Sequence, residues 1–123
     1  MKKTALILFA HGSRTAQWAD PFYRLQQHIE RNRPDILVLP AFLELMQPTL
    51  QQAIEQIYNA GLREAVVLPV FLAAGAHLKR DLPLLVSQAT QQYPDMRIRV
   101  LPPLGESDAL LQAIADWASA AID

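Results

Sequence analysis

The residues best suited to chemistry stand directly after apolar stretches of the chain. The apolar run Ala5–Phe9 leads through Ala10 into His11, Gly12, Ser13 and Arg14. An apolar run without polar alternation is typical of a strand buried on both faces, and such strands occur mostly in helix-covered parallel sheets. Because ligands bind at the carboxyl ends of strands in open α/β sheets, His11 could bind a metal ion or transfer a proton there.

Glu44 and His77 stand after two further apolar stretches. Glu44 closes the run that begins at residue 36, and His77 follows the run 67–72 and the small residues 73–76. The three side chains are therefore expected at one edge of the sheet. Two imidazoles and a carboxylate suit a divalent cation such as Co²⁺, Ni²⁺, Fe²⁺ or Zn²⁺. Taken singly, a histidine at a strand-turn-helix junction could be structural, but the convergence of three groups favours a metal site.

Polar and basic residues flank the two histidines. Ser13 adds a hydroxyl beside His11, and Arg14, Lys79 and Arg80 add positive charge near both histidines. Together these side chains could bind and orient an anionic organic substrate. The alternative is that Lys79 and Arg80 form the solvated start of a helix.

The surrounding pattern predicts four alternating strand and helix units. Strands are expected at 5–9, 36–44, 64–72 and 97–101, and helices at about 20–31, 49–59, 77 or 81 to 92, and 107–121. With right-handed crossovers, this order gives a four-stranded parallel sheet with helices on both faces. The predicted fold class is therefore α/β, a three-layer α/β/α domain over residues 1–123.

Several positions carry specific structural expectations. Asp20 is predicted to cap the first helix, with Pro21 at its first position, and His28 to be a solvated surface residue of that helix. Pro40 should mark the end of its strand, a bulge or a sheet edge, whereas Pro83 is acceptable only in the first turn of its helix. The last helix is predicted to bury one apolar side, formed by Leu110, Leu111, Ile114, Trp117, Ala118 and Ile122.

Composition excludes several classes of function. The net charge of −1, without a basic run, gives no reason to expect a nucleic-acid partner. Cysteine is absent, so any transition-metal site must use imidazole, carboxylate or carbonyl ligands. The glycine-rich nucleotide-binding motifs and the G-x-S-x-G elbow are also absent. No convincing targeting segment and no apolar stretch of membrane-spanning length is found, so a cytoplasmic protein without a membrane partner is expected.

Two motifs carry a resemblance to a known family. The segment 8–14 resembles the opening motif of the sirohydrochlorin chelatases, and the segment 68–77, with Asp81 and Pro83 behind it, resembles their second motif. The segments 41–44 and 103–105 match weaker blocks. The similarity spans nearly the whole chain, and its length fits the short, single-domain sirohydrochlorin cobaltochelatases.

The resemblance implies an activity and a set of site residues. The family inserts a divalent metal into sirohydrochlorin with release of two protons, in tetrapyrrole and cobalamin biosynthesis. Cobalt is the expected metal, with nickel or iron as alternatives, and no organic cofactor is expected. By motif position His11 and His77 are the catalytic and metal-binding histidines, and Glu44 matches an acidic position of the family. Many relatives carry a histidine soon after the Leu-Gly block, where this chain has Glu106-Ser107-Asp108.

The sequence leaves two other functions open and also predicts an assembly. The same histidines could serve a metal- or tetrapyrrole-binding module without turnover, or the chain could be a flavodoxin-like regulatory or phosphate-binding domain. Larger relatives place two such domains across a cleft, so one domain is expected to form a homodimer around a shared cleft. The apolar residues expected at the interface or the substrate floor are Leu43, Leu45, Met46 and Leu78.

Overall fold

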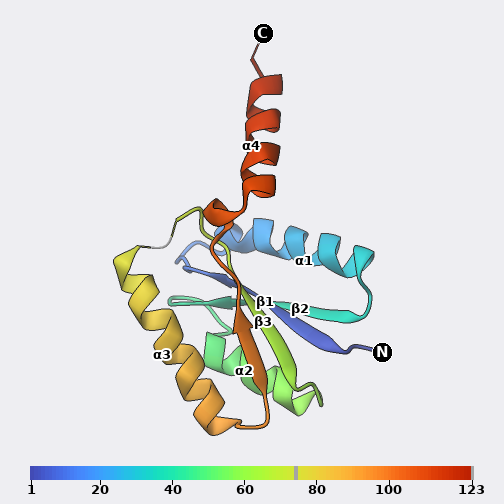
Figure 1. Cartoon of the computed structure of the whole chain (residues 1–123), viewed down its shortest axis with the longest axis vertical. Coiled ribbons are helices and arrows are strands. Elements are labelled where there is room, and N and C mark those ends of the chain that lie inside the picture. The colour runs from blue at the N-terminus through green and yellow to red at the C-terminus, as the bar shows by residue number, and fades with distance from the viewer. Residues whose placement is uncertain (74, 123) are drawn as a thin grey trace.

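The chain forms a single parallel sheet with helices on both faces (Figure 1). The computed structural model describes residues 1–73 and 75–122, and the side chain of His77 lies outside the described part. The strands are β1 (Thr4–Ala10), β2 (Ile36–Phe42), β3 (Glu64–Pro69) and β4 (Arg97–Val100), in the order β2-β1-β3-β4. The helices are η1 (Ala16–Ala19), α1 (Asp20–Asn32), α2 (Leu50–Asn59), α3 (Ala76–Gln92), η2 (Leu104–Glu106) and α4 (Asp108–Ala120). The predicted α/β class is confirmed.

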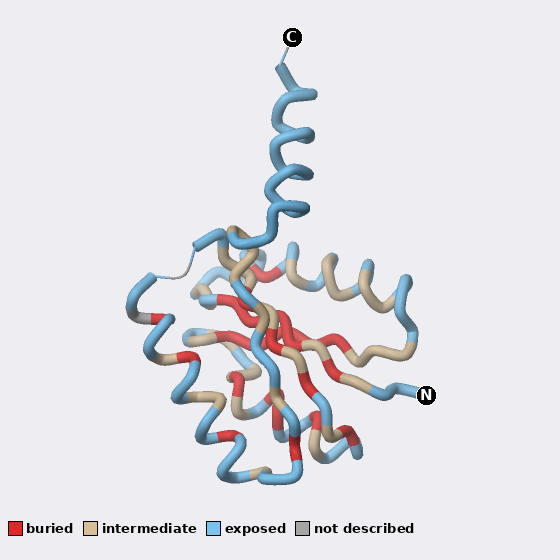
Figure 2. The backbone as a smooth tube through the Cα atoms, viewed as in Figure 1, coloured by how far each residue is buried: buried red, intermediate tan, exposed pale blue. Residues whose placement is uncertain are grey.

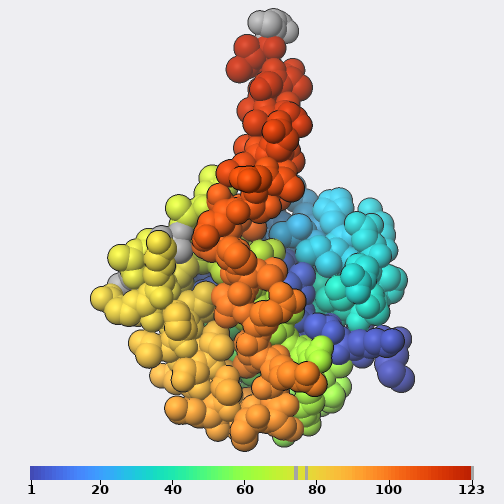
Figure 3. Space-filling model, in the orientation of Figure 1, coloured from blue at the N-terminus to red at the C-terminus, as the bar shows by residue number. Residues whose placement is uncertain are grey.

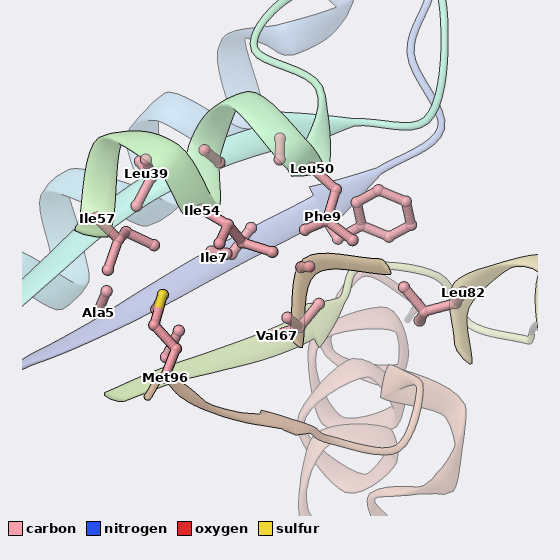
Figure 4. Close-up of a cluster of buried hydrophobic side chains, with 14 of the residues drawn as sticks. Ala5, Ile7, Phe9, Leu39, Leu50, Ile54, Ile57, Val67, Leu82 and Met96 are labelled. Atoms are coloured by element: carbon pink, nitrogen blue, oxygen red, sulfur yellow. The ribbon is translucent and has the colours of Figure 1, made fainter. Parts of the chain in front are cut away.

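The main hydrophobic core lies between the sheet and the helices α2 and α3. The central strand β1 pairs with both β2 and β3, so that Ile7 stands between Leu39 and Val67. Ile54 of α2 packs in the same cluster (Figure 4). β1 is apolar throughout the sheet centre because strands on both sides and helices above and below exclude water from it.

Helix α2 begins with a capping box that also fixes the loop before it. The Thr49 Oγ1 accepts a hydrogen bond from the backbone N–H of Gln52 at 3.2 Å, and the Gln52 side chain accepts one from the Thr49 N–H at 2.9 Å. The N–H of Phe42, at the end of β2, donates to the carbonyl of Pro48 at 2.9 Å. The loop 43–48, which carries Glu44, is therefore anchored at both ends.

Pro40 lies inside β2, which is an edge strand, as predicted. Pro83 contradicts its prediction, because α3 begins at Ala76 and Pro83 lies in its interior. The proline ring leaves the Lys79 carbonyl without its helical N–H donor. Pro83 itself is exposed.

Other predicted boundaries also differ from the structure: β2 ends at Phe42 and not at residue 44, and β4 at Val100 and not at residue 101. Asp20 is the first residue of α1 and not its cap, since η1 runs directly into α1 and Ala19 occupies the cap position without a side-chain hydrogen bond. β3 ends at Pro69 and not at residue 72, because its partner β1 ends one pair later. The last backbone bond there joins the Val70 N–H to the Phe9 carbonyl at 2.8 Å.

Helix α4 departs most from expectation. It extends away from the body of the molecule, and its described residues are exposed throughout (Figure 2). The apolar side that the sequence predicts to be buried is open, because α4 contacts η2 and makes no comparable contact with a strand of the described chain. Neither α4 nor another helix in residues 1–73 and 75–122 is long and apolar enough to cross a membrane.

Candidate active site

The sheet order places the candidate residues at a topological switch point. From β1 the chain crosses through α1 to β2 on one side, whereas β3 leads through α3 to β4 on the other side (Figure 1). Ligands of open α/β sheets bind outside the carboxyl ends of the strands at such a point. His11 follows β1, and the segment leading to His77 follows β3, so both belong to the two strands that flank the switch point.

His11 and Glu44 lie together at this edge. The His11 Nε2 is 3.6 Å from the Glu44 Oε1. Two backbone bonds hold them: the Leu43 N–H donates to the Ala10 carbonyl at 2.9 Å, and the Glu44 N–H to the His11 carbonyl at 3.1 Å. The side chains are 60% and 57% exposed, respectively, so an incoming metal ion or ligand can reach both.

Gly12 allows this close approach of the two chain segments. Its φ of +104° is one that side-chain-bearing residues rarely adopt. A Cβ atom built on Gly12 would lie 1.8 Å from the backbone oxygen of Glu44. The His-Gly pair in the sequence therefore has a structural cause, because the Glu44 backbone occupies the space of a Gly12 side chain.

For His77, the third predicted ligand, the structure describes only the position of the backbone. His77 lies in the first turn of α3, whose cap position is Gly75, and its side chain lies outside the described residues. Among the described side chains no group of three or more His, Asp or Glu could hold a metal ion. The structure thus brings together His11 and Glu44, and the contribution of His77 stays a prediction.

The predicted substrate-binding residues lie around the same edge with different local roles. The Ser13 Oγ accepts a hydrogen bond from the Thr15 N–H at 3.1 Å, which is typical of a serine that stabilises a turn. Arg14 and Lys79 are exposed. Arg80 lies beside Asp81, with 3.7 Å between the Arg80 Nε and the Asp81 Oδ1.

A hollow next to α3 contains a residue that the sequence did not assign to the site. It has a volume of about 310 Å³ and is lined by Leu72, Ala73, Lys79, Pro103, Gly105 and Glu106. A Cβ atom on Gly105 would lie 1.7 Å from the Leu72 carbonyl oxygen. Only glycine allows the backbone at residue 105 to pack this closely on Leu72, so the Leu-Gly block of the sequence could have pointed to this contact. The contact brings Glu106 into the hollow that Lys79 also lines.

The apolar residues expected near the cleft divide into two kinds. Leu45 is 56% exposed, and Leu43 and Met46 are half-buried. Leu78 is only 7% exposed and belongs to the main core, so it differs from the other three predicted residues. Leu72, which was not predicted, is 62% exposed at this edge.

Comparisons with known proteins agree with this architecture. A family model described as CbiX matches residues 5–121. A sirohydrochlorin cobaltochelatase of Methanosarcina barkeri is 31% identical over 70% of this chain and 66% of its own length. A sirohydrochlorin ferrochelatase of Priestia megaterium is 25% identical over 91% of this chain and 42% of its own length. This chain therefore spans less than two thirds of either relative.

A solved structure covers the chain more evenly. It is a putative cobalamin biosynthesis CbiX protein from Marinobacter aquaeolei, with a TM-score of 0.84 and 29% identity over 97% of both chains. Fold and site together define an open parallel α/β domain with a histidine–carboxylate pair at its switch point. Because the CbiX model matches nearly the whole chain, this chain belongs to the CbiX family.

Proposed function

We propose that this chain, as one domain over residues 1–123, inserts a divalent metal ion into sirohydrochlorin, with cobalt as the metal substrate. The observation that carries the proposal is the His11–Glu44 pair, 3.6 Å apart and solvent-accessible at the switch point. Relatives named sirohydrochlorin cobaltochelatase and sirohydrochlorin ferrochelatase support the substrate class. His11, His77 and Glu44 are the proposed metal ligands.

The chemistry requires exchangeable ligands and bases. As the metal forms bonds to the macrocycle nitrogens, two pyrrole N–H protons must leave, and positioned side chains must accept them. The imidazole of His11, on a side chain that is 60% exposed, can accept one proton, and the Glu44 carboxylate lies 3.6 Å from it. His77 is the proposed acceptor of the other proton. Because the donors are imidazole and carboxylate, the metal ion is held without thiolate and can pass on to the macrocycle.

A side-by-side turnover assay tests the activity and the metal. Co²⁺, Ni²⁺ and Fe²⁺ are each supplied with sirohydrochlorin under anaerobic conditions, and metal insertion is followed by the change in absorbance. Cobalt is expected to give the highest rate. Turnover with iron or nickel ahead of cobalt would overturn the metal assignment alone, whereas binding without turnover for all three would identify a metal- or tetrapyrrole-binding module.

Charge at the rim should act mainly on substrate binding. Arg14→Ala, or Lys79→Ala together with Arg80→Ala, is expected to raise the KM for the carboxylate-rich macrocycle more than it lowers kcat, because long-range attraction mainly accelerates association. Added salt should have the same effect on the unaltered protein. The control is Arg24→Ala, an exposed arginine of α1. A KM that changes neither with the substitutions nor with salt would contradict a role for these residues in substrate binding.

The proposed active form is a homodimer around a shared cleft. Sirohydrochlorin is broad and flat, while the candidate site occupies one edge of a small domain. Two-fold dimers are also the commonest oligomers. Analytical ultracentrifugation at assay concentration should give a mass of two chains. A fully active monomer in the presence of substrate would show that the site works from one side only.

A further inference from the structure

Leu45 has a backbone conformation that leucine rarely adopts. Its φ is +68°, in the left-handed region, and the other two described residues with a positive φ are both glycines, Gly12 and Gly61. In this conformation the Cβ atom comes too close to the following carbonyl oxygen, so leucine is less stable here than glycine would be. Strained residues of this kind cluster at active sites and in ligand-binding loops, where the surrounding structure holds them in place.

Packing within the chain does not explain why this residue is a leucine. The side chain of Leu45 is 56% exposed and belongs to neither of the two hydrophobic clusters in the described part of the chain. The next residue, Met46, does pack on the smaller cluster, which is formed by Ala10, Ala19 and Phe42. Leu45 is therefore both strained and exposed, in a loop whose other apolar residues are at least half-buried.

The loop around Leu45 is anchored on both sides of this residue. The Glu44 N–H donates to the His11 carbonyl at 3.1 Å, and Gly12 packs against the Glu44 backbone. At the other end of the loop, the Pro48 carbonyl accepts a hydrogen bond from the last residue of β2 at 2.9 Å. The loop that positions Glu44 therefore also presents an exposed apolar side chain directly beside this proposed metal ligand.

A second exposed leucine lies on the other side of the switch point. Leu72 is 62% exposed and follows β3, whereas Leu45 follows β2. The strand β1, which leads to His11, lies between these two strands, and neighbouring strands are about 4.8 Å apart. The segment after β3 lies at the surface of the molecule beside the base of α4 (Figure 3). Exposed apolar side chains thus follow both neighbours of the strand that leads to His11.

We propose that Leu45 and Leu72 contact the flat apolar face of the tetrapyrrole and hold its ring over His11. The inference rests on the proposed function, which supplies a ligand that is apolar on its face and carries carboxylates at its periphery. Arg14 and Lys79 are exposed at the same edge and can meet the carboxylates, whereas the ring face requires apolar contacts. A side chain that is held in place before the substrate arrives also loses less entropy on binding.

The strain at Leu45 can be tested without any ligand. Leu45→Gly and Leu45→Asn introduce residues that tolerate a positive φ, whereas Leu45→Ala keeps the unfavourable conformation. The glycine and asparagine variants should therefore unfold at a higher urea concentration than the alanine variant. Leu45→Gly should also exceed the wild type, although it removes the whole side chain. Midpoints below the wild type for both Leu45→Gly and Leu45→Asn would show that the side chain packs in the fold, and would overturn the proposal.

Binding of sirohydrochlorin in the absence of a metal ion tests the contact itself. Leu45→Ala and Leu72→Ala should each raise the Kd about 10-fold, as expected when apolar groups are removed from a binding site. Leu45→Met remains apolar and should keep the wild-type Kd. The matched control is Leu84→Ala, because Leu84 is an equally exposed leucine (58%) in the middle of α3. A wild-type Kd in both Leu45→Ala and Leu72→Ala would overturn the proposal.

The decisive variant is Leu45→Asn, because the two measurements should change in opposite directions. Asparagine relieves the backbone strain and removes the apolar contact, so this variant should be more stable than Leu45→Ala and should bind sirohydrochlorin as weakly. A leucine that only supports the fold would lose stability and binding together. Sedimentation of Leu45→Asn should give the wild-type mass. A lower mass together with weaker binding would show that Leu45 contacts a second copy of the chain, and would contradict a direct contact with the substrate.

These measurements separate the leucine contacts from the proposed function. A wild-type protein that binds sirohydrochlorin and inserts no metal would contradict the chelatase activity alone, since the Kd values of the leucine variants would still decide the contacts. A wild-type protein that inserts metal, with Leu45→Ala and Leu72→Ala binding sirohydrochlorin equally well, would contradict the leucine contacts alone.

Discussion

Replacement of either His11 or His77 by alanine should abolish metal insertion while the protein still unfolds cooperatively. Loss of a positioned proton acceptor alone costs roughly 10²- to 10⁴-fold in rate, and each variant also loses a metal ligand. His11 lies on an exposed turn with a 60% exposed side chain, so no core packing depends on it. His77 lies in the first turn of α3, directly after the exposed residue Ala76. The rate is measured by absorbance with Co²⁺ and sirohydrochlorin, and folding by thermal unfolding.

The chain provides a matched control for the histidine variants. His28 is exposed on α1, away from the carboxyl edge, so His28→Ala should leave both the rate and the unfolding transition unchanged. Glu44→Gln keeps the size of the side chain and removes its charge, and should reduce the rate by less than His11→Ala. If His11→Ala unfolds without a cooperative transition, the histidine is structural and the assigned role is wrong.

The sheet could be predicted because its signals are local. The unbroken apolar run 5–9 predicts a buried strand, and it lies within the observed β1, Thr4–Ala10. Pro40 predicted a strand end, a bulge or a sheet edge for β2, and the strand order shows that it is an edge. The wet face of β4 agrees with the alternation of Arg97 and Arg99 with apolar residues. The interior position of Pro83 was not predicted, because α3 begins at Ala76, well before the proline.

The burial of α4 was mispredicted for a different reason. An apolar stripe at helical spacing predicts that a helix packs against something, but it does not say whether the partner surface belongs to the same chain. Here the short anchored segment 101–107 sets the direction of α4. Its backbone hydrogen bonds to β3 and to Phe71 have no signature in the sequence.

The candidate site shows the same division between local and long-range information. The residue types and their positions after strands identified His11, Glu44 and the carboxyl edge. The adjacency of His11 and Glu44 depends on the pairing of β1 with β2, and the switch point depends on the strand order, neither of which a single sequence shows. Glu106 was not assigned, because its approach to Lys79 depends on the contact of Gly105 with Leu72.

Outside the proposed metal ligands, Gly12 should be the position where substitution most reduces stability and activity. Gly12→Ala places a methyl group where the Glu44 carbonyl lies, and the backbone there has a φ of +104°. The unfavourable conformation costs about 1–3 kcal/mol, and overpacking about 1–3 kcal/mol more. Because the clash is with backbone, the loop 43–48 must move, which separates His11 from Glu44. Both the free energy of unfolding in urea and the metal-insertion rate should therefore fall.

Gly61→Ala separates the clash from the backbone conformation. Gly61 also has a positive φ, of +88°, but a Cβ atom there meets nothing within 4 Å. This variant should lose only the conformational part of the stability and keep the wild-type rate, since Gly61 follows α2, away from the carboxyl edge. The difference between the losses of unfolding free energy in Gly12→Ala and Gly61→Ala then measures the contact between Gly12 and Glu44. Equal losses, with full activity in both variants, would show that the loop carrying Glu44 yields without disturbing the site.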